Sequence, residues 1–367
     1  MKILFIGNFF NESYSMNIYV NELFKEFNKS DLDIELFRPR KNSSHIIKLF
    51  YKYFYFPFII LNRSKDKAIL HIGDQSYAFL SRYFKYLNKN IKIIITCHDI
   101  IPYYYAKDLF NHSLFGSISN YLWRASIYSL KNAHIILSDS NYTRGKIIQY
   151  LNIESSRIRV VYLGTNQLTQ NQTPSEILLA KLKLYENKKL LLSVGSNETR
   201  KNLNILIDVL KLLNRNKNDF ILLRVGENIS KEQEQMLRNY DQLSNVVQLG
   251  KLSSNDLKYV FEKSHIFLFP SFEEGFGLPC LEAMNQGVPV IASYSASIPE
   301  IVGNAGILVD PFNADSFVKA IYEIGESDNK REELVKAGYE RVKMFSWRAT
   351  ASKVIEIYNL ALNGTLE

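Results

Sequence analysis

Two glutamates in the C-terminal half of the chain are spaced to bracket a ligand rather than to work as a close acid and base pair. Glu274 and Glu282 are separated by seven residues within FPSFEEGFGLPCLEAMNQGVP, residues 269–289. This spacing places one carboxylate in a loop and the other on the first turns of the helix that follows. Each carboxylate can accept hydrogen bonds from hydroxyl groups on either side of a bound phosphate. The pair therefore predicts a ligand that carries both phosphate and hydroxyl groups.

The backbone between these glutamates has the composition of an anion-binding loop. Glycine lets the backbone pass close to a ligand, and Pro279 suits the first turn of a helix. The free amides at the start of that helix would point at an anion. The residues expected around the ligand, besides the two glutamates, are Gly275, Phe276, Gly277 and Leu278.

A second group of candidate residues lies in VGSNETRKNL, residues 194–203. A strand is predicted to end at Gly195, followed by Ser196 and a short loop. Arg200 and Lys201 then come just before a helix that begins near residue 202. Two fixed cations at this place would neutralise a diphosphate without a metal ion. Because no acidic cluster resembling D-x-D follows a strand, we expect neither a metal site nor a cofactor.

A third candidate follows a buried strand in IIITCHDIIP, residues 93–102. His98 and Asp99 stand at the carboxyl end of that strand, where side chains of doubly wound folds reach ligands. His71 ends another strand, and there a structural role is the favoured interpretation. We predict that His98 is functional and that His71 is part of the interior.

The segment from Glu274 to Glu282 resembles the E-x7-E signature of family 4 retaining glycosyltransferases, which have the two-domain GT-B fold. Residues 287–311, 137–144 and 157–164 are also similar to that family. The resemblance implies that Glu274 contacts donor-sugar hydroxyls, that Glu282 contacts the nucleotide ribose, and that Arg200 and Lys201 bind the donor phosphates. It further implies that His98 lies near the transferred sugar.

The order of elements agrees with that resemblance. Short β-branched runs alternate with amphipathic segments, as in parallel strands joined by crossover helices. Together they predict an α/β fold with two Rossmann-like doubly wound domains that face each other across a cleft. The predicted strands are residues 2–7, 68–73, 91–97, 134–138 and 159–163 in the first half and 190–195, 220–226, 246–250, 266–270, 288–292 and 307–310 in the second.

We place an acceptor-binding domain at residues 1–168 and a nucleotide-sugar-binding domain at residues 169–345. The polar stretch Thr165–Ser175 is the candidate linker. Residues 346–367 are predicted to form a helix, capped by Ser346, that packs back toward the first domain. The loop at residues 8–17 contains no glycine, so we assign no catalytic residue to it; the missing G-x-G-x-x-G also counts against a dinucleotide oxidoreductase.

The charge is concentrated in the first domain. Of the 367 residues, the first 168 carry 22 Lys and Arg against 12 Asp and Glu, a net charge of +10, whereas the whole chain has +8. Aromatic residues accompany this charge in IIKLFYKYFYFPFIILNR, residues 46–63, which indicates contact with an anionic membrane surface rather than nucleic acid. A core segment with solvated lysines is the competing interpretation. No secretory signal or spanning stretch is recognised, and two cysteines are consistent with a reducing cytoplasm.

These features predict a metal-independent, retaining glycosyltransferase. Its donor would be a GDP- or UDP-linked sugar, and its acceptor a hydroxyl of a glycan or a polyprenyl-linked glycan in surface polysaccharide synthesis. Mannosyltransferase-like relatives are favoured by the HDIIP and RKN elements, and the enzyme is expected at the inner face of the membrane. Two alternatives remain at this point: a nucleotide-sugar epimerase of the same architecture, and a non-catalytic partner in a glycosylation complex.

Overall fold

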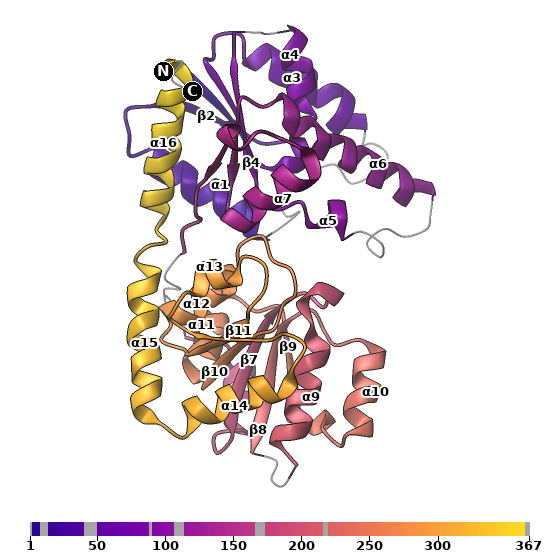
Figure 1. The fold of residues 1–367 in the computed structure, drawn as a ribbon, viewed down its shortest axis with the longest axis vertical. Helices are drawn as coiled ribbons and strands as arrows, with labels where there is room; N and C mark the ends of the chain where they lie inside the picture. The colour runs from indigo at the N-terminus through magenta and orange to yellow at the C-terminus, as the bar shows by residue number, and fades with distance from the viewer. Residues whose placement is uncertain are drawn as a thin grey trace. The chain divides into compact units, whose positions relative to one another are not determined.

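The structure is a computed structural model that describes residues 2–7, 14–39, 50–87, 90–105, 114–165, 173–215 and 219–363. The chain forms two compact units, one of residues 1–164 and 345–367 and the other of residues 165–344. Most of the predicted linker Thr165–Ser175 lies outside the described residues, as do residues 8–13 of the glycine-free loop. In each unit, helices flank a single twisted sheet (Figure 1).

The first unit contains a six-stranded parallel sheet in the order β2-β1-β3-β4-β5-β6. The strands are β1 (Lys2–Ile6), β2 (Asp33–Phe37), β3 (Ile69–Ile72), β4 (Lys92–Cys97), β5 (Ile135–Ser138) and β6 (Ile158–Val160). The helices are α1 (Tyr14–Phe27), α3 (Phe56–Arg63), α4 (Leu80–Leu87), α5 (Ile101–Tyr104), α6 (Leu114–Tyr128), α7 (Asn141–Leu151) and α16 (Trp347–Asn363).

The C-terminal helix α16 belongs to this first unit and packs on α1 (Figure 1). Its start is capped as predicted, because the amide of Ala349 donates to Ser346 Oγ over 3.1 Å. Farther along, the hydroxyl of Tyr358 bonds to Nδ1 of His71 at 2.6 Å inside the unit. The chain therefore returns to complete the unit in which it began.

The second unit contains a six-stranded parallel sheet in the order β12-β11-β10-β7-β8-β9. The strands are β7 (Lys189–Gly195), β8 (Phe220–Gly226), β9 (Val246–Gly250), β10 (Ile266–Phe269), β11 (Val290–Ser293) and β12 (Ile307–Val309). The helices are α8 (Glu176–Lys183), α9 (Leu203–Leu213), α10 (Lys231–Asn239), α11 (Ser254–Lys263), α12 (Leu278–Asn285), α13 (Ile298–Val302), α14 (Ala314–Gly325) and α15 (Asp328–Val342).

This second strand order reverses direction between β7 and β10, which makes that point the topological switch of the sheet. In open parallel sheets, ligands bind beside the switch point at the carboxyl ends of the strands. The loops that leave β7 and β10 contain two of the three candidate groups, residues 195–201 and 274–282. The two doubly wound sheets confirm the predicted fold class.

One strand of the first sheet, β2, was not predicted. All five of its residues, DIELF, are at least partly exposed, because β2 is an edge strand that pairs only with β1. An edge strand lacks the continuous apolar run by which buried parallel strands are recognised.

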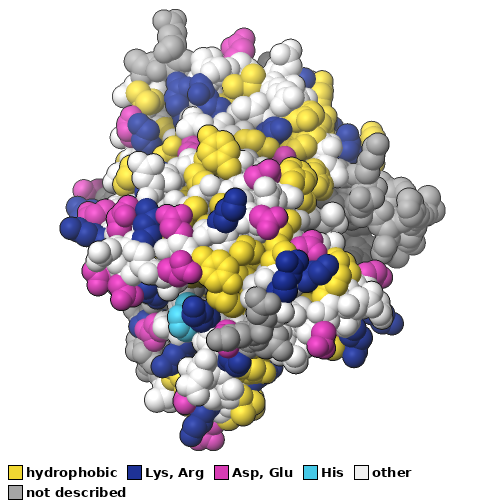
Figure 2. All heavy atoms as spheres, turned by 60° about the horizontal axis from the view of Figure 1, so that its bottom comes forward, with side chains coloured by type: hydrophobic (Ala, Val, Ile, Leu, Met, Phe, Trp, Pro, Cys, Tyr) yellow, Lys and Arg dark blue, Asp and Glu magenta, His cyan; other side chains and the backbone are white. Residues whose placement is uncertain are grey.

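Charged side chains are mixed on the molecular face drawn in Figure 2. Lys and Arg side chains alternate there with Asp and Glu, and hydrophobic side chains lie between them. The described side chains on that face therefore form no continuous basic patch.

Candidate active site

The loop that follows β7 begins with a close approach between two strand ends. Gly195 and Gly226 are paired across β7 and β8, with φ angles of 145° and 109°. A Cβ atom on Gly226 would lie 2.1 Å from the carbonyl oxygen of Gly195, so no larger residue fits there. Glycine at position 226 therefore lets the end of β8 lie against the carbonyl group of Gly195.

The basic residues of this loop lie in a short 3-10 turn, Thr199–Lys201, that is tied to the neighbouring loop. The carbonyl oxygen of Arg200 accepts from the amide of Phe272 over 2.8 Å. Asn202, with a φ of 53°, follows the turn and donates to the carbonyl oxygens of Pro270 at 3.2 Å and Pro311 at 2.7 Å. These bonds hold the loops after β7 and β10 together.

Three of the predicted site residues meet in one cluster of charges. Lys201 Nζ donates to Oε1 of Glu274 over 2.6 Å, and Arg200 Nη1 lies 3.3 Å from Oε2 of the same carboxylate. Arg200 also donates through Nε to Glu198 over 2.6 Å. Glu274 is 7% exposed. The structure therefore brings Arg200, Lys201 and Glu274 together at the switch point, with Glu198 as a fourth member.

Glu198 is a member of this cluster that the sequence alone did not reveal. Burial alone would raise the pKa of its carboxyl group, but the charge and hydrogen bonds of Arg200 and the hydroxyl of Ser196 lower it overall. Ser196 Oγ donates to Glu198 Oε1 at 3.0 Å. The only signal in the sequence was the proximity of Glu198 to two basic residues, which is common on solvated helix starts.

The loop before α12, residues 274–277, is held in place by the hydroxyl group of Ser297. Gly277, with a φ of 113°, is the N-cap of α12, and Pro279 lies in the first turn, as the sequence predicted. Ser297 Oγ donates to the carbonyl oxygens of Glu274 at 3.0 Å and Phe276 at 2.8 Å. The loop is therefore fixed with amides at the start of α12 available to an anion.

Glu282 lies on α12, the helix that directly follows the loop containing Glu274. Its side chain is partly buried, and burial raises the pKa of its carboxyl group to about 7. A carboxyl group in this state can exchange its proton near neutral pH, and it becomes a stronger acceptor where a ligand donates to it. Glu282 shares the second unit with Arg200, Lys201 and Glu274.

His98 belongs to the first unit and is engaged on both ring nitrogens. Nδ1 lies 2.7 Å from Asp139 Oδ2, and Nε2 lies 3.1 Å from the carbonyl oxygen of Gly73. Burial alone would lower the pKa of His98, but the Asp139 carboxylate, with a further contribution from Asp74, raises it to about 9. Both partners are acceptors, which requires a proton on each nitrogen. His98 is accordingly an imidazolium at neutral pH, and its partner Asp139 was not predicted.

The other two residues of the third candidate group have structural roles. Asp99 accepts from the amide of Ile101, the first residue of α5, over 3.0 Å. His71 is fully buried, bonded to Tyr358 and, through Nε2, to Thr96 Oγ1 at 2.8 Å. Burial lowers the pKa of His71 to about 3, so this ring is neutral. The structural interpretation of His71 is confirmed.

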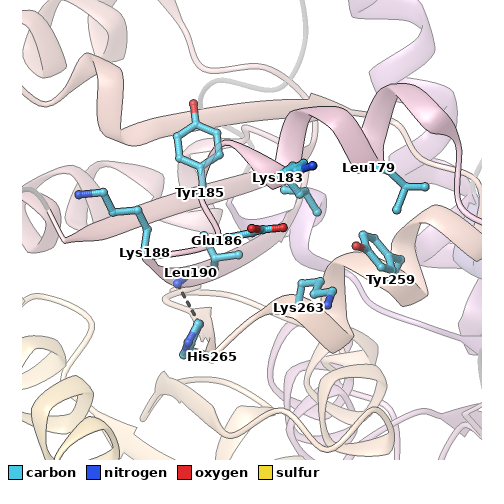
Figure 3. A pocket seen from close by; sticks show the side chains of 10 residues that line it. Leu179, Lys183, Tyr185, Glu186, Lys188, Leu190, Tyr259, Lys263 and His265 are labelled. Carbon is cyan, nitrogen blue, oxygen red and sulfur yellow. Dashed lines mark hydrogen bonds between the residues drawn. The ribbon is translucent and has the colours of Figure 1, made fainter.

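A pocket of about 400 Å³ lies at the other end of the second sheet. It is found where β7 and β10 begin, and it contains none of the predicted site residues. Figure 3 shows its side chains, with the amide of Leu190 donating to Nδ1 of His265 over 3.0 Å. Because ligands of such sheets bind at the carboxyl ends of the strands, this pocket is not the candidate site. Its lining includes Lys183, Glu186, Lys188, Tyr259 and Lys263.

Two family models together match most of the chain. Residues 17–167 match Glycosyltransferase Family 4, and residues 174–341 match Glycosyl transferases group 1. The O-antigen chain mannosyltransferase B of Escherichia coli is 31% identical over 278 residues, 73% of this chain and 70% of that protein. The chain belongs to the family 4 glycosyltransferases. Its activity is accordingly that of a glycosyltransferase.

Other relatives agree with this family. The O-antigen chain mannosyltransferase RfbU of Salmonella typhimurium is 28% identical over 63% of this chain and 60% of that protein. Among solved structures, sucrose-phosphate synthase from Thermosynechococcus elongatus has a TM-score of 0.77 at 20% identity, covering 99% of both chains. The glycosyltransferase WaaG has a TM-score of 0.71 at 15% identity, covering 97% of this chain and 99% of that one. These two likenesses establish the fold.

Proposed function

We propose that this enzyme transfers a hexose, with retention of anomeric configuration and without a metal ion, from a GDP- or UDP-linked sugar to a glycan or polyprenyl-linked glycan acceptor. The observation that carries the proposal is the convergence of Arg200, Lys201 and Glu274 beside the start of α12. Mannosyltransferases of O-antigen chains among the relatives support a hexose donor and an acceptor in surface polysaccharide synthesis.

The chemistry that this cluster could perform follows from the charge that develops during transfer. Cleavage of the donor builds negative charge on the leaving diphosphate, and fixed cations and helix amides stabilise it without reorganising. Arg200 and Lys201 would bind that diphosphate, Glu274 would accept from donor-sugar hydroxyls, and Glu282 would accept from the ribose. Among the described residues, no group of three or more His, Cys, Asp or Glu side chains is placed to hold a metal ion.

Retention would follow from transfer on a single face of the sugar, with the departing phosphate taking the acceptor proton. His98 would then orient the sugar rather than act as the base, since its ring is held as an imidazolium by Asp139 and Gly73. An epimerase would require a separate acid and base pair at the sugar. The relatives named above are glycosyltransferases, so they give no support to the epimerase or to a non-catalytic partner.

Binding of the donor is the direct test of this proposal. Thermal-shift measurements with UDP, GDP, ADP and their sugars should identify one nucleotide that stabilises the enzyme, and Lys201→Ala and Glu282→Ala should abolish that shift. His98→Ala should keep the shift yet slow transfer. We expect transfer to persist in EDTA. We also expect the NMR spectrum of the product to show the same anomeric configuration as the donor sugar. A product with inverted configuration would overturn the retaining mechanism.

We further propose that the first unit contacts an anionic membrane through the helical segment that includes α3. Of residues 46–63, positions 46–49 lie outside the described residues. Phe56 and Ile60 are fully buried, whereas Phe54 and Phe58 are each 70% exposed and Phe50 is 63% exposed. The segment thus serves the core with one face and leaves aromatic rings on the other, next to basic residues such as Arg63. Among the described residues, no helix is long and apolar enough to cross a membrane.

Flotation with vesicles that contain anionic lipid is the test of this contact, which would place the enzyme at the cytoplasmic face of the membrane. Phe54→Ser together with Phe58→Ser should weaken binding at least about tenfold, because large apolar side chains lose their interfacial burial. The matched control is Phe312→Ser in the second unit, where the ring is 77% exposed. Equal binding by all variants, or binding insensitive to salt, would remove the membrane proposal.

A further inference from the structure

Arg224 is a buried arginine in β8 that lies against the backbone of the loop after β7. Its side chain is 2% exposed. Nη2 donates to the carbonyl oxygens of Gly195 at 2.6 Å and Ser196 at 2.7 Å. Nη1 donates to the carbonyl oxygens of Val225 at 3.2 Å and Ser193 at 3.4 Å. The guanidinium group therefore underlies the stretch of backbone that leads to the basic cluster.

The positive charge of Arg224 has no carboxylate partner in an ion pair among the described residues. Burial lowers the pKa of its guanidinium to about 10, partly opposed by the charge of Glu227, so it remains charged at neutral pH. Glu227 itself accepts from the amide of Asn197 over 2.8 Å. Buried charges in proteins are usually paired. An unpaired one beneath an anion-binding loop is expected where the ligand supplies the opposite charge.

The other cations of the loop are already partly neutralised. Arg200 is bonded to Glu198 and Glu274, and Lys201 is bonded to Glu274, so two basic side chains face two carboxylates. The residue directly after Gly195 is Ser196, which has no charge. Arg224 contacts the carbonyl group of that serine. Unlike Arg200 and Lys201, it is held by carbonyl groups and not by a carboxylate.

We propose that Arg224 is a positioning residue for the donor diphosphate. It draws the carbonyl oxygens of Gly195 and Ser196 inward, which keeps their negative ends away from the bound anion. Its charge, in an interior of low dielectric constant, acts on the diphosphate across a single layer of backbone. The inference rests on the proposed function of the second unit as the donor-binding unit.

The test compares a nucleoside with its diphosphate in the full-length enzyme. Affinities of uridine and UDP, or of guanosine and GDP, are measured by calorimetry for the wild type, Arg224→Gln and Arg224→Lys. For Arg224→Gln, we expect diphosphate affinity to fall at least about tenfold and nucleoside affinity to change less than about twofold. Arg224→Lys keeps the charge, so its preference for the diphosphate should stay within about threefold of the wild type.

The outcomes separate the inference from the function on which it rests. A wild-type enzyme that binds no nucleoside diphosphate would overturn both. If the wild type binds, an equal loss of nucleoside and diphosphate affinity, or no loss at all, would overturn the role of Arg224 alone. If Arg224→Gln does not fold, Arg224→Lys provides the test. This variant keeps the positive charge, so a loss of its preference for the diphosphate over the nucleoside would contradict the proposed role of that charge. Arg331→Gln is the matched control, since Arg331 donates to the carbonyl oxygen of His265 before β10 begins.

Discussion

At the scale of single residues, the candidate residues of the two units hold their charges in different ways. In the second unit, the carboxylate of Glu274 is shared between two cations, Lys201 and Arg200. In the first unit, His98 is enclosed between Asp139 and the carbonyl of Gly73, so its charge is fixed.

The pair of His98 and Asp139 predicts a pH dependence that can be measured. The native pKa of His98 is about 9, above its ordinary value of 6.5, so the stabilisation is complete below pH 6.5 and is lost as pH rises through 9. Asp139→Asn should therefore lower the free energy of unfolding by about 3 kcal/mol at pH 6 and much less at pH 10. Urea unfolding at the two pH values measures this difference.

An NMR titration of the His98 ring distinguishes this charge effect from loose packing. Asp139→Asn should lower the pKa of His98 by about two pH units, because burial is then opposed only by the charge of Asp74 and the hydrogen bond to the Gly73 carbonyl. The ring of Tyr19, at 4.9 Å from that of His98, and the neutral His71 remain in place. A titration midpoint equal to that of the wild type would mean that Asp139 does not set the charge of His98.

For Glu282, stability again falls as pH rises, but removing the charge should stabilise the protein instead of destabilising it. Its native pKa of about 7 is above the ordinary 4.5, so the native state binds more protons and stability falls as pH rises between these values. Glu282→Gln without ligand should be more stable than the wild type at pH 8, by up to about 3 kcal/mol, and equal to it near pH 4.5. Its affinity for a ribonucleotide should nevertheless be lower.

Thermal unfolding across that pH range is the measurement for Glu282. The matched control is Glu326→Gln at the exposed end of α14, which should change stability by less than about 0.5 kcal/mol at either pH. A variant that is less stable than the wild type at pH 8 would show that the carboxylate is compensated by protein groups rather than left for a ligand.

At the scale of elements, the segment from the last residue of β11 to the start of α13, residues 293–297, supports the loop before α12. Ser293, Ser295 and Ser297 donate in turn to the carbonyl oxygens of Ser271, Phe272 and Glu274, and Ser297 reaches Phe276 as well. Every second side chain along this segment therefore bonds to the loop. These contacts and the positive φ of Gly277 together fix the start of α12.

Loss of one support should be detectable in nucleotide affinity. Ser297→Ala removes a fully buried hydroxyl whose single proton is shared between the carbonyl oxygens of Glu274 and Phe276, and it should lower the free energy of unfolding by about 1 to 3 kcal/mol. We expect nucleotide affinity to fall about fivefold or more. Ser253→Ala, which removes the cap of α11, is the control: it should lower stability by about 1 kcal/mol without changing affinity. Equal affinities in both variants would contradict the supporting role.

Element types were predictable from the sequence where one pattern dominates. The six strands of the second unit are mostly apolar runs that end at Gly or Ser or directly before Pro or Asp, and each was expected within a few residues of its observed bounds. The glycine, proline and glutamate spacing of residues 274–282 likewise predicted a loop and a helix start, which the structure confirms. Local patterns suffice when the determining interactions are local.

The site residues that the sequence did not predict are those whose roles depend on contacts with residues distant in the chain. Arg224 stands within the strand FILLRVG, where one polar residue looks like a solvated position, and only the strand order places it beneath Ser196. Asp139 precedes α7 as an ordinary loop residue, and its pairing with His98 spans 41 positions. No periodicity encodes such contacts, because they arise from register and packing.

At the scale of the whole molecule, the chain forms two units with separate cores. One core gathers around Ile72, Phe84 and Ile95, and the other around Leu191, Leu210 and Leu268. The chain passes from the first unit to the second after residue 164 and returns after residue 344. Because each unit buries its own apolar side chains, each can unfold as a cooperative unit.

This division predicts that a nucleotide stabilises one unfolding transition and not the other. A ligand at 100 times its dissociation constant adds about 2.7 kcal/mol to the unit that binds it. In calorimetry, a nucleoside diphosphate should therefore raise the transition of the second unit alone. Tyr358→Phe should lower the other transition by removing the bond between α16 and His71, with about 1 kcal/mol lost, and leave the nucleotide shift intact. A single transition that shifts in both experiments would show that the two units unfold together. The assignment of donor binding to the second unit would then depend on the nucleotide affinities of the Lys201 and Arg224 variants.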